Sequence, residues 1–299
     1  MGRVDGRTAA RPTRARRQVR GDHLARARPV AGRRVTPQHS SQFTSTIRSN
    51  TVSKVLLVGE TWIIQETHIK GFDSFSTSRF GVGGVDWTAT VEAGGHEVTN
   101  LPAHLVPQNM PSTAEQLAEY DVIVLSDIGS SSLAVPLTVW LGGPGNNSMV
   151  ALREWVRSGG AIVMCGGYLS FAGIDGKGKY ANTPVEEVLP VTVLPYDDRV
   201  ENPEFNVPVT VDGAHPLARG LPDDWPAIFG YNRVKAKSGS QVIATVGEDP
   251  FIVAGAYGQG RTLAFTTDIG PHWAPQAFLD SPAYRQFWPR AIDWVSGAI

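Results

Sequence analysis

Short, unbroken apolar segments that alternate with helical segments constrain the fold of this chain more than any other feature. Segments 53–59, 120–126 and 161–165 are rich in Val, Ile and Leu and have the length of a strand. Such runs are typical of parallel strands that are buried on both faces. Segments 85–93 and 148–157 read as helices, and a Gly-Gly pair closely follows each. We therefore expect right-handed β-α-β units in an α/β domain with a mainly parallel central sheet.

The pattern changes after Pro190, where strand-like segments follow one another without long helices between them. We expect these to be additional mixed or antiparallel strands that extend the same sheet. They are residues 191–194, 207–211, 241–246, 251–257 and 261–266, with Gly258-Gln-Gly260 as a hairpin turn. A final helix at 283–294 has core-facing aromatic residues at helical spacing. No second domain boundary is visible, so one domain is expected over residues 53–298.

The charge of the chain is divided unevenly. Residues 1–50 contain twelve arginines and two aspartates, a net charge of +10, whereas the whole chain has a net charge of −1. Residues 1–50 are therefore expected to be a disordered basic tail, since they have few large apolar residues. The tail has the composition of a transit peptide or of a nucleic-acid-binding arm, or it is an extension without a role. The remaining chain is acidic, which argues against a nucleic-acid surface on the folded domain.

Cys165 is the only cysteine, which excludes a disulfide within the chain and a zinc site built from cysteines. His68, His96, His104 and His215 are scattered without the spacing of metal ligands. We expect no metal and no cofactor. No apolar run is long enough to cross a bilayer, and no secretory signal is visible. A cytoplasmic protein without a membrane partner is the expectation.

Several polar phrases, with their order and spacing, resemble the putative glutamine amidotransferase family over residues 53–298. They are VLSDIG (124–129), GGYLSFAGI (166–174), TPVEEVLP (183–190), DDRVE (197–201), GYN (230–232), YGQGR (257–261) and DIGPHW (268–273). The resemblance implies the flavodoxin-like, three-layer core of the class I glutamine amidotransferase-like superfamily. It implies no demonstrated reaction, because the family is named by kinship of fold.

In catalytic class I amidotransferases the nucleophilic cysteine occupies a Gly-x-Cys-x-Gly turn between a strand and a helix. Here the expected strand 161–165 runs into Gly166-Gly-Tyr-Leu-Ser170. Tyr168 falls where the cysteine belongs, and Ser170 replaces the second glycine. Cys165 lies three residues early and is expected to be buried and inert. In the alternative frame Cys165 is the nucleophile, but a valine then replaces the first glycine of the turn.

The other catalytic motifs of those enzymes are also out of place. Their Gly-Gly-Pro-Gly oxyanion loop directly follows the third strand, whereas Asp127-Ile-Gly129 follows it here. The phrase Gly142-Gly-Pro-Gly145 lies well downstream and matches by coincidence. Around His272 there is no carboxylate at the spacing of the His-x-Glu pair. The standard Cys-His-Glu triad is therefore expected to be absent.

Ligands of parallel α/β sheets bind beyond the carboxyl ends of the strands. The polar residues expected there are Glu60, Asp127, Tyr168, Ser170, Asp268 and His272. Tyr231 and Asn232 follow Gly230 in a segment that could reach over the pocket. His272 could act as a general base with Asp268 as its orienting group. Alternatively, Asp268 caps the following turn and His272 packs beside Trp273.

The segment Asp197-Asp-Arg-Val-Glu201 leaves two readings open. Its carboxylates could form a metal site, but a solvated loop with an Asp–Arg ion pair is favoured, because hard cations need more converging oxygens than adjacent residues supply.

Three kinds of function fit these observations. The first is an amidotransferase-like enzyme that has lost its glutaminase triad and keeps a polar pocket, or a divergent hydrolase that uses His272 and Asp268. The second is a non-catalytic module that binds a small polar molecule or a carbohydrate. The third is a subunit of a homo-oligomer, in which Trp273, Trp288 and Trp294 would form contacts.

Overall fold

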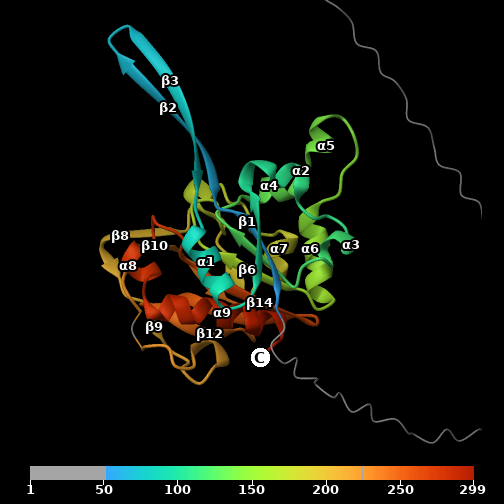
Figure 1. The fold of residues 1–299 in the computed structure, drawn as a ribbon, viewed down its shortest axis with the longest axis vertical. Coiled ribbons are helices and arrows are strands. Elements are labelled where there is room, and N and C mark those ends of the chain that lie inside the picture. Colours follow the sequence, from blue (N-terminus) through green and yellow to red (C-terminus); the bar gives the residue numbers. More distant parts are fainter. Residues whose placement is uncertain (1–51, 224) are drawn as a thin grey trace, which may run out of the picture. The chain divides into compact units, whose positions relative to one another are not determined.

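The computed structural model describes residues 52–223 and 225–299, and a mainly parallel eight-stranded sheet organises them (Figure 1). The predicted basic tail, residues 1–50, lies outside this described part. The order of the strands in the sheet is β4-β1-β5-β6-β14-β13-β12-β9. Their bounds are β1 (Lys54–Gly59), β4 (Glu97–Pro102), β5 (Val122–Ser126), β6 (Ala161–Cys165), β9 (Val209–Thr210), β12 (Gln241–Val246), β13 (Asp249–Tyr257) and β14 (Gly260–Phe265). The first five strands in this order are parallel, and the last three are antiparallel.

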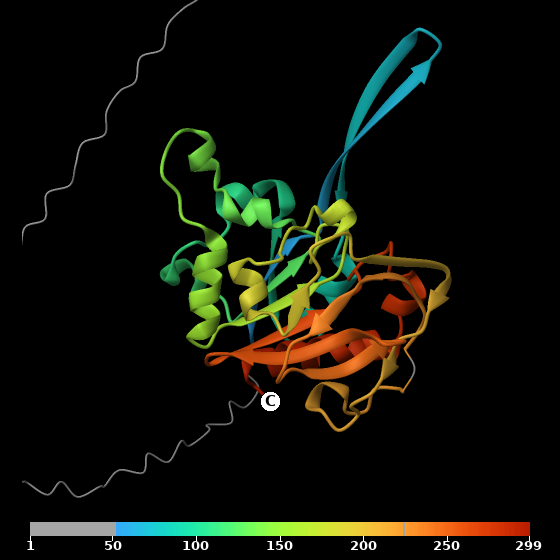
Figure 2. The same cartoon turned by 180° about the vertical axis from the view of Figure 1, so that it is seen from behind.

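Helices cover both faces of this sheet, so the domain has three layers (Figures 1 and 2). Alternate residues of β1 enter opposite cores: Val55 and Leu57 join one cluster, and Leu56 and Val58 join the other. This is the burial expected of a strand without a polar face. The helices are α1 (Val85–Ala93), α2 (Val106–Asn109), α3 (Ala114–Leu117), α4 (Ser130–Ala134), α5 (Leu137–Trp140), α6 (Ser148–Arg157), α7 (Pro184–Val188), α8 (Gln276–Leu279) and α9 (Pro282–Ser296), with short 3₁₀ turns at Ala103–Leu105, Ile174–Gly176 and Pro216–Ala218.

The predicted fold class is confirmed, including the antiparallel strands at the C-terminal side of the sheet. Four predicted elements have the observed bounds: α1, α6, β6 and β12. Strand β9 is shorter than the predicted segment 207–211, because it pairs only at the edge of the sheet and follows Pro208, which has no N–H to donate. In the described part of the chain, no helix combines the length and apolar character needed to cross a bilayer.

Two short ribbons flank the main sheet. Strand β8 (Arg199–Asn206) pairs with β10 (Ile228–Asn232), and β7 (Val191–Val193) pairs with β11 (Val234–Ala236), both antiparallel. Residues 197–201 were predicted to be a charged loop. Instead, residues 199–201 form the start of β8, and Asp198 just before it is buried. The predicted ion pair is present, since Arg199 and Asp197 approach to 2.7 Å.

A long hairpin was not predicted. Strands β2 (Thr61–Lys70) and β3 (Asp73–Val82) pair with each other alone and extend away from the rest of the described residues (Figure 1). We call residues 61–82 the arm. Its two-residue turn has Gly71 with φ of +61° at the first position, followed by Phe72, a sequence that suits a tight hairpin turn. Most of the arm's side chains are exposed.

The end of β1 lies unusually close to β5, and this contact requires glycine. Gly59 has φ of +110°, and a Cβ atom there would lie 1.9 Å from the carbonyl oxygen of Ser126. The next residue, Glu60, donates its backbone N–H to the same oxygen at 3.2 Å. The glycine therefore sets how closely the residues that follow the two strands can approach each other.

A Gly59→Ala substitution should separate this steric contact from simple backbone strain. Gly95→Ala is the matched control, because Gly95 also has a positive φ but open space around its Cβ position. Positive φ alone costs about 1–3 kcal/mol in either variant. We expect Gly59→Ala to lower the free energy of unfolding by at least about 2 kcal/mol more than the control does, measured by urea denaturation. Equal losses would contradict a tight contact between β1 and β5.

Candidate functional site

Three parallel strands deliver carboxyl groups to one edge of the sheet. Glu60 follows β1, Asp127 follows β5, and Asp268 lies three residues after the end of β14. Because carboxyl ends of parallel strands meet at one edge, these groups converge. They border a pocket of about 610 Å³, which is lined by Glu60, Trp62, Ile64, Arg79, Val82, Gly83, Asp127, Tyr168, Asp268, Gly270, Pro271 and His272.

Glu60 is the most deeply buried acid of the pocket. Its φ of +51° lies in the left-handed region, and its Oε1 accepts a short hydrogen bond from the hydroxyl of Ser126. Burial, followed by the charges of Asp127 and Asp268, raises its pKa to about 8. At neutral pH Glu60 is therefore mainly a neutral acid that carries a proton.

Asp127 also has a left-handed backbone, with φ of +45°. Its Oδ1 accepts the backbone N–H of Leu169 at 2.7 Å, and its Oδ2 accepts the indole N–H of Trp62 at 3.0 Å. Its own backbone N–H donates to the hydroxyl of Ser170 at 3.1 Å. Burial and then the charge of Asp268 raise the pKa of Asp127, whereas its hydrogen bonds oppose the rise. Two residues in sparsely populated backbone regions thus lie at one site, which is a feature of functional sites.

The predicted pair of Asp268 and His272 forms. Their side chains approach to 3.4 Å between Oδ2 and Nδ1, and His272 is about half exposed. The hydrogen bond to Asp268 raises the pKa of His272 above its ordinary value, and this favours the charged imidazolium. Asp268 also accepts the backbone N–H of Trp273 at 3.0 Å. The carboxylate therefore both caps the turn and pairs with the histidine.

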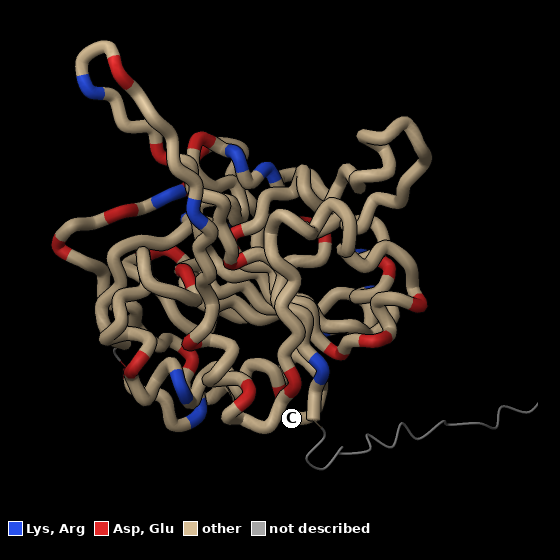
Figure 3. Tube along the Cα trace, turned by 45° about the horizontal axis from the view of Figure 1, so that its top comes forward, with Lys and Arg blue, Asp and Glu red and all other residues tan. Residues whose placement is uncertain are grey.

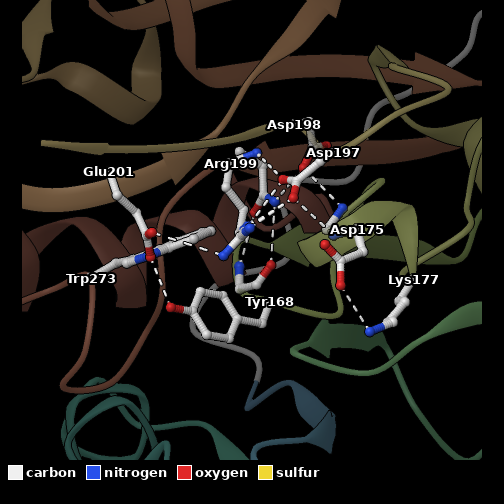
Figure 4. Close-up of polar contacts among 11 residues, drawn as sticks. Tyr168, Asp175, Lys177, Asp197, Asp198, Arg199, Glu201 and Trp273 are labelled. Atoms are coloured by element: carbon white, nitrogen blue, oxygen red, sulfur yellow. Dashed lines mark hydrogen bonds and ion pairs between the residues drawn. The ribbon is translucent and has the colours of Figure 1, made fainter.

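Tyr168 stands beside this pair. Its ring is edge-on to that of His272, with centroids 4.8 Å apart. Its hydroxyl donates to Oε1 of Glu201 at 2.9 Å, and the indole of Trp273 donates to the same oxygen at 2.9 Å (Figure 4). The guanidinium of Arg199 lies over the ring, 5.2 Å from its centroid. These contacts fix the tyrosine as one wall of the pocket.

Three other predicted site residues do not line the pocket. Ser170 is buried and supports Asp127 from behind. Asn232 is fully buried, where its Oδ1 accepts the N–H of Gly167 at 2.9 Å and its Nδ2 donates to Asp198 at 2.8 Å. The hydroxyl of Tyr231 donates to Asp249 at 2.8 Å. Asn232 and Ser170 therefore brace the loop after β6.

Cys165 ends strand β6 and is completely buried. Burial, followed by the nearby charge of Glu60, raises the pKa of its thiol well above the ordinary value. The following Gly166 is packed so tightly that a Cβ atom there would lie 2.2 Å from the carbonyl oxygen of Thr266. A thiol in this setting is a small hydrophobic side chain at neutral pH.

Sequence reasoning missed the wall that the arm contributes. Trp62, Ile64 and Arg79 all belong to the arm and line the pocket. The signal was present, since Thr61–Lys70 is rich in β-branched and aromatic residues and is followed by the Gly71-Phe72 turn. Within residues 52–223 and 225–299, no three or more His, Cys, Asp or Glu side chains are placed to hold a metal ion.

The raised pKa of Glu60 predicts how stability changes with pH. The pKa rises from 4.5 to about 8 on folding, so the folded state binds more protons between these values. The free energy of unfolding should therefore fall as pH rises from 4.5 to 8, by about 5 kcal/mol from this group. Glu60→Gln replaces the neutral acid by a neutral amide and should remove most of this decline, as measured by denaturation at several pH values.

The exposed Glu204 supplies the control for this measurement. Glu204→Gln should leave the decline in place. The pKa of Asp127 is also raised, so in the Glu60→Gln variant the free energy of unfolding should still fall with rising pH, but by less. An unchanged decline in Glu60→Gln would mean that Glu60 is ionised at neutral pH.

Comparisons with known proteins identify one family and several similar structures. The family model described as "Putative glutamine amidotransferase" matches residues 54–297. The solved structure of the Salmonella typhimurium cytoplasmic protein STM3548 is similar at 38% identity and a TM-score of 0.78, covering 81% of this chain and 98% of that chain. The cytoplasmic protein STM1381 from Salmonella typhimurium LT2 is similar at 39% identity and a TM-score of 0.78, covering 81% and 99%.

No curated protein matched the chain. The family match nevertheless covers nearly all of the described domain, and the two Salmonella structures share its fold over almost their whole length. The chain therefore belongs to the putative glutamine amidotransferase family.

Proposed function

We propose that this chain lacks cysteine-based glutaminase activity and binds a small polar molecule in the pocket at the carboxyl ends of β1, β5 and β14. The observation that carries the proposal is the hydrogen bond from the backbone N–H of Leu169 to the carboxylate of Asp127, at 2.7 Å. In the nucleophile turn of related enzymes, the N–H after the nucleophile stabilises the oxyanion. Tyr168 occupies the nucleophile position, so Leu169 is the residue that would supply this N–H.

A carboxylate on this donor opposes oxyanion chemistry in two ways. It satisfies the N–H before any substrate arrives, and its negative charge repels a developing oxyanion. The N–H of Gly167 is also satisfied, because it donates to the amide oxygen of Asn232 at 2.9 Å. Cys165 supports the same conclusion, since its buried thiol with a raised pKa is a poor nucleophile.

The groups that line the pocket favour a ligand with several hydroxyl or amino groups. Asp127 and Asp268 offer acceptor oxygens, and Glu60 in its neutral form can also donate. The rings of Trp62 and Tyr168 add apolar faces beside these polar groups. A polyhydroxylated ring or a small amine fits this combination. The two Salmonella relatives are described as cytoplasmic proteins, and we propose the same compartment for this chain.

A second candidate function is hydrolysis by His272 with Asp268. The ion pair at 3.4 Å and the half-exposed imidazole favour it. The hydrogen bond to Asp268 raises the pKa of His272, and this favours the imidazolium, which suits a general acid. The same ring can act as a base only above its raised pKa. Hydrolysis would then show as conversion of a bound ligand that His272→Ala abolishes.

The absence of glutaminase activity can be measured directly on the full chain. We expect no ammonia release from glutamine, because the oxyanion donor is occupied and the thiol is buried. Labelling of Cys165 by a maleimide should be at least about 100-fold slower in the native chain than in denaturant, as expected for a protected thiol. Ammonia release that Cys165→Ala abolishes would overturn the proposal.

Ligand binding needs a separate experiment. Monosaccharides, polyols and small amines would be screened by thermal shift, and affinities then measured by calorimetry. Asp127→Asn keeps the side-chain shape and suits a positive φ, but it removes the charge. We expect it to weaken binding by roughly 10- to 100-fold, because a hydrogen bond to a charged group contributes about 1.5–3 kcal/mol.

Asp175→Asn is the matched control for this variant. Asp175 also has a left-handed backbone, with φ of +52°, but it is exposed and pairs with Lys177 at 2.9 Å outside the pocket (Figure 4). Its substitution should leave the affinity unchanged. Failure of all three ligand classes to bind, or equal weakening by both variants, would contradict the proposed pocket.

A further inference from the structure

The arm exposes large apolar side chains on both of its faces. Ile63, Ile69 and Phe80 share one face, Phe75 lies on the other, and Phe72 is in the turn. Its strands pair only with each other, so both outer edges keep unpaired N–H and C=O groups. An isolated two-stranded hairpin is marginally stable in water, and an exposed apolar edge is open to pairing with another chain.

We propose that the arm is a dimerisation element that docks on a second copy of this chain. The arm has two acidic and two basic residues, Glu66, Asp73, Lys70 and Arg79, so it has no net charge (Figure 3). An uncharged apolar surface of the partner can therefore receive it without an unpaired net charge. In a two-fold dimer the arm of each copy contacts the same surface of the other copy, so the contact is made twice.

The size of the arm argues for a reciprocal arrangement. Each strand has ten residues. The arm is thus about 34 Å long and about 10 Å wide, and one face offers on the order of 300 Å². A stable interface buries about 800 Å² on each partner. The area of one arm is too small for a stable interface. If each copy both inserts its own arm and receives the arm of its partner, the area buried on each copy doubles and approaches this value.

The receiving surface that fits best is the segment 137–141, which contains α5. Leu137, Val139, Trp140 and Leu141 are exposed there, Trp140 to 77%. This segment and the arm both rise from the same end of the domain in two opposite views (Figures 1 and 2). Partners that face each other with these ends can exchange arms. Other exposed apolar residues, Phe205, Val207, Val209 and Val211, lie in and around β9, away from this end (Figure 1).

The tryptophans that the sequence suggested for oligomer contacts are unavailable. Trp273 and Trp288 are completely buried and Trp294 nearly so, all within the chain's own core. The aromatic residues at helical spacing in the final helix pack against the sheet. The exposed apolar residues available for association lie on the arm.

Sedimentation equilibrium of the full chain would test the proposal. We expect a dimer of the 32.2-kDa chain. Phe75→Glu and, separately, Trp140→Glu should each weaken association by at least tenfold, because each places a charge in the apolar contact. Val211→Glu is the matched control, since Val211 and Phe75 are both 56% exposed, and it should remain dimeric.

Hydrogen exchange gives a second readout that does not depend on folding of a variant. Backbone amides of β2 and β3 should exchange more slowly in the wild-type dimer than after dilution to monomer, because the contact buries the arm and suppresses its opening. A chain that is monomeric at all concentrations would overturn the proposal. A dimer that Phe75→Glu leaves intact, or that Val211→Glu dissociates, would overturn it equally, and an intact Trp140→Glu dimer would exclude α5 as the receiving surface.

Discussion

The close contact between the ends of β1 and β5 is the constraint on which the site depends. Only glycine at position 59 lets the two backbones approach, and the chain then turns through left-handed residues at Glu60 and Asp127. These turns aim two carboxyl groups at a third, Asp268, that arrives from β14. Burial, followed by the charges of Asp127 and Asp268, raises the pKa of Glu60 to about 8, and burial followed by the charge of Asp268 raises the pKa of Asp127. The pocket is thus a place where the fold stores unfavourable electrostatic energy.

Much of the fold could be predicted because the signals are local. Segments such as 161–165 and 148–157 carry their own apolar pattern and end at glycines, so their bounds were predicted correctly. Asp127, Tyr168, Asp268 and His272 line the pocket because the carboxyl ends of parallel strands share one edge. That rule needs only the order of elements along the chain.

The remaining features depend on contacts between distant segments. Asn232 is buried and makes hydrogen bonds with Gly167 and Asp198, and no sequence pattern predicts these long-range contacts. The arm has no buried face, so it lacks the alternation of apolar and polar residues that reveals a strand in a sheet. Its β-branched and aromatic composition and its turn sequence were available, and these are weaker signals than periodicity.

The hydrogen bond from Trp62 to Asp127 has a consequence for the whole domain. The indole belongs to the foot of the arm, and it is one of the groups that hold the Asp127 carboxylate in its charged form. A displacement of the arm that removes this donor increases the proton affinity of Asp127. Linkage is reciprocal, so protonation of Asp127 in turn weakens the anchorage of the arm. The position of the arm and the protonation of Asp127 in the pocket are therefore coupled through one equilibrium.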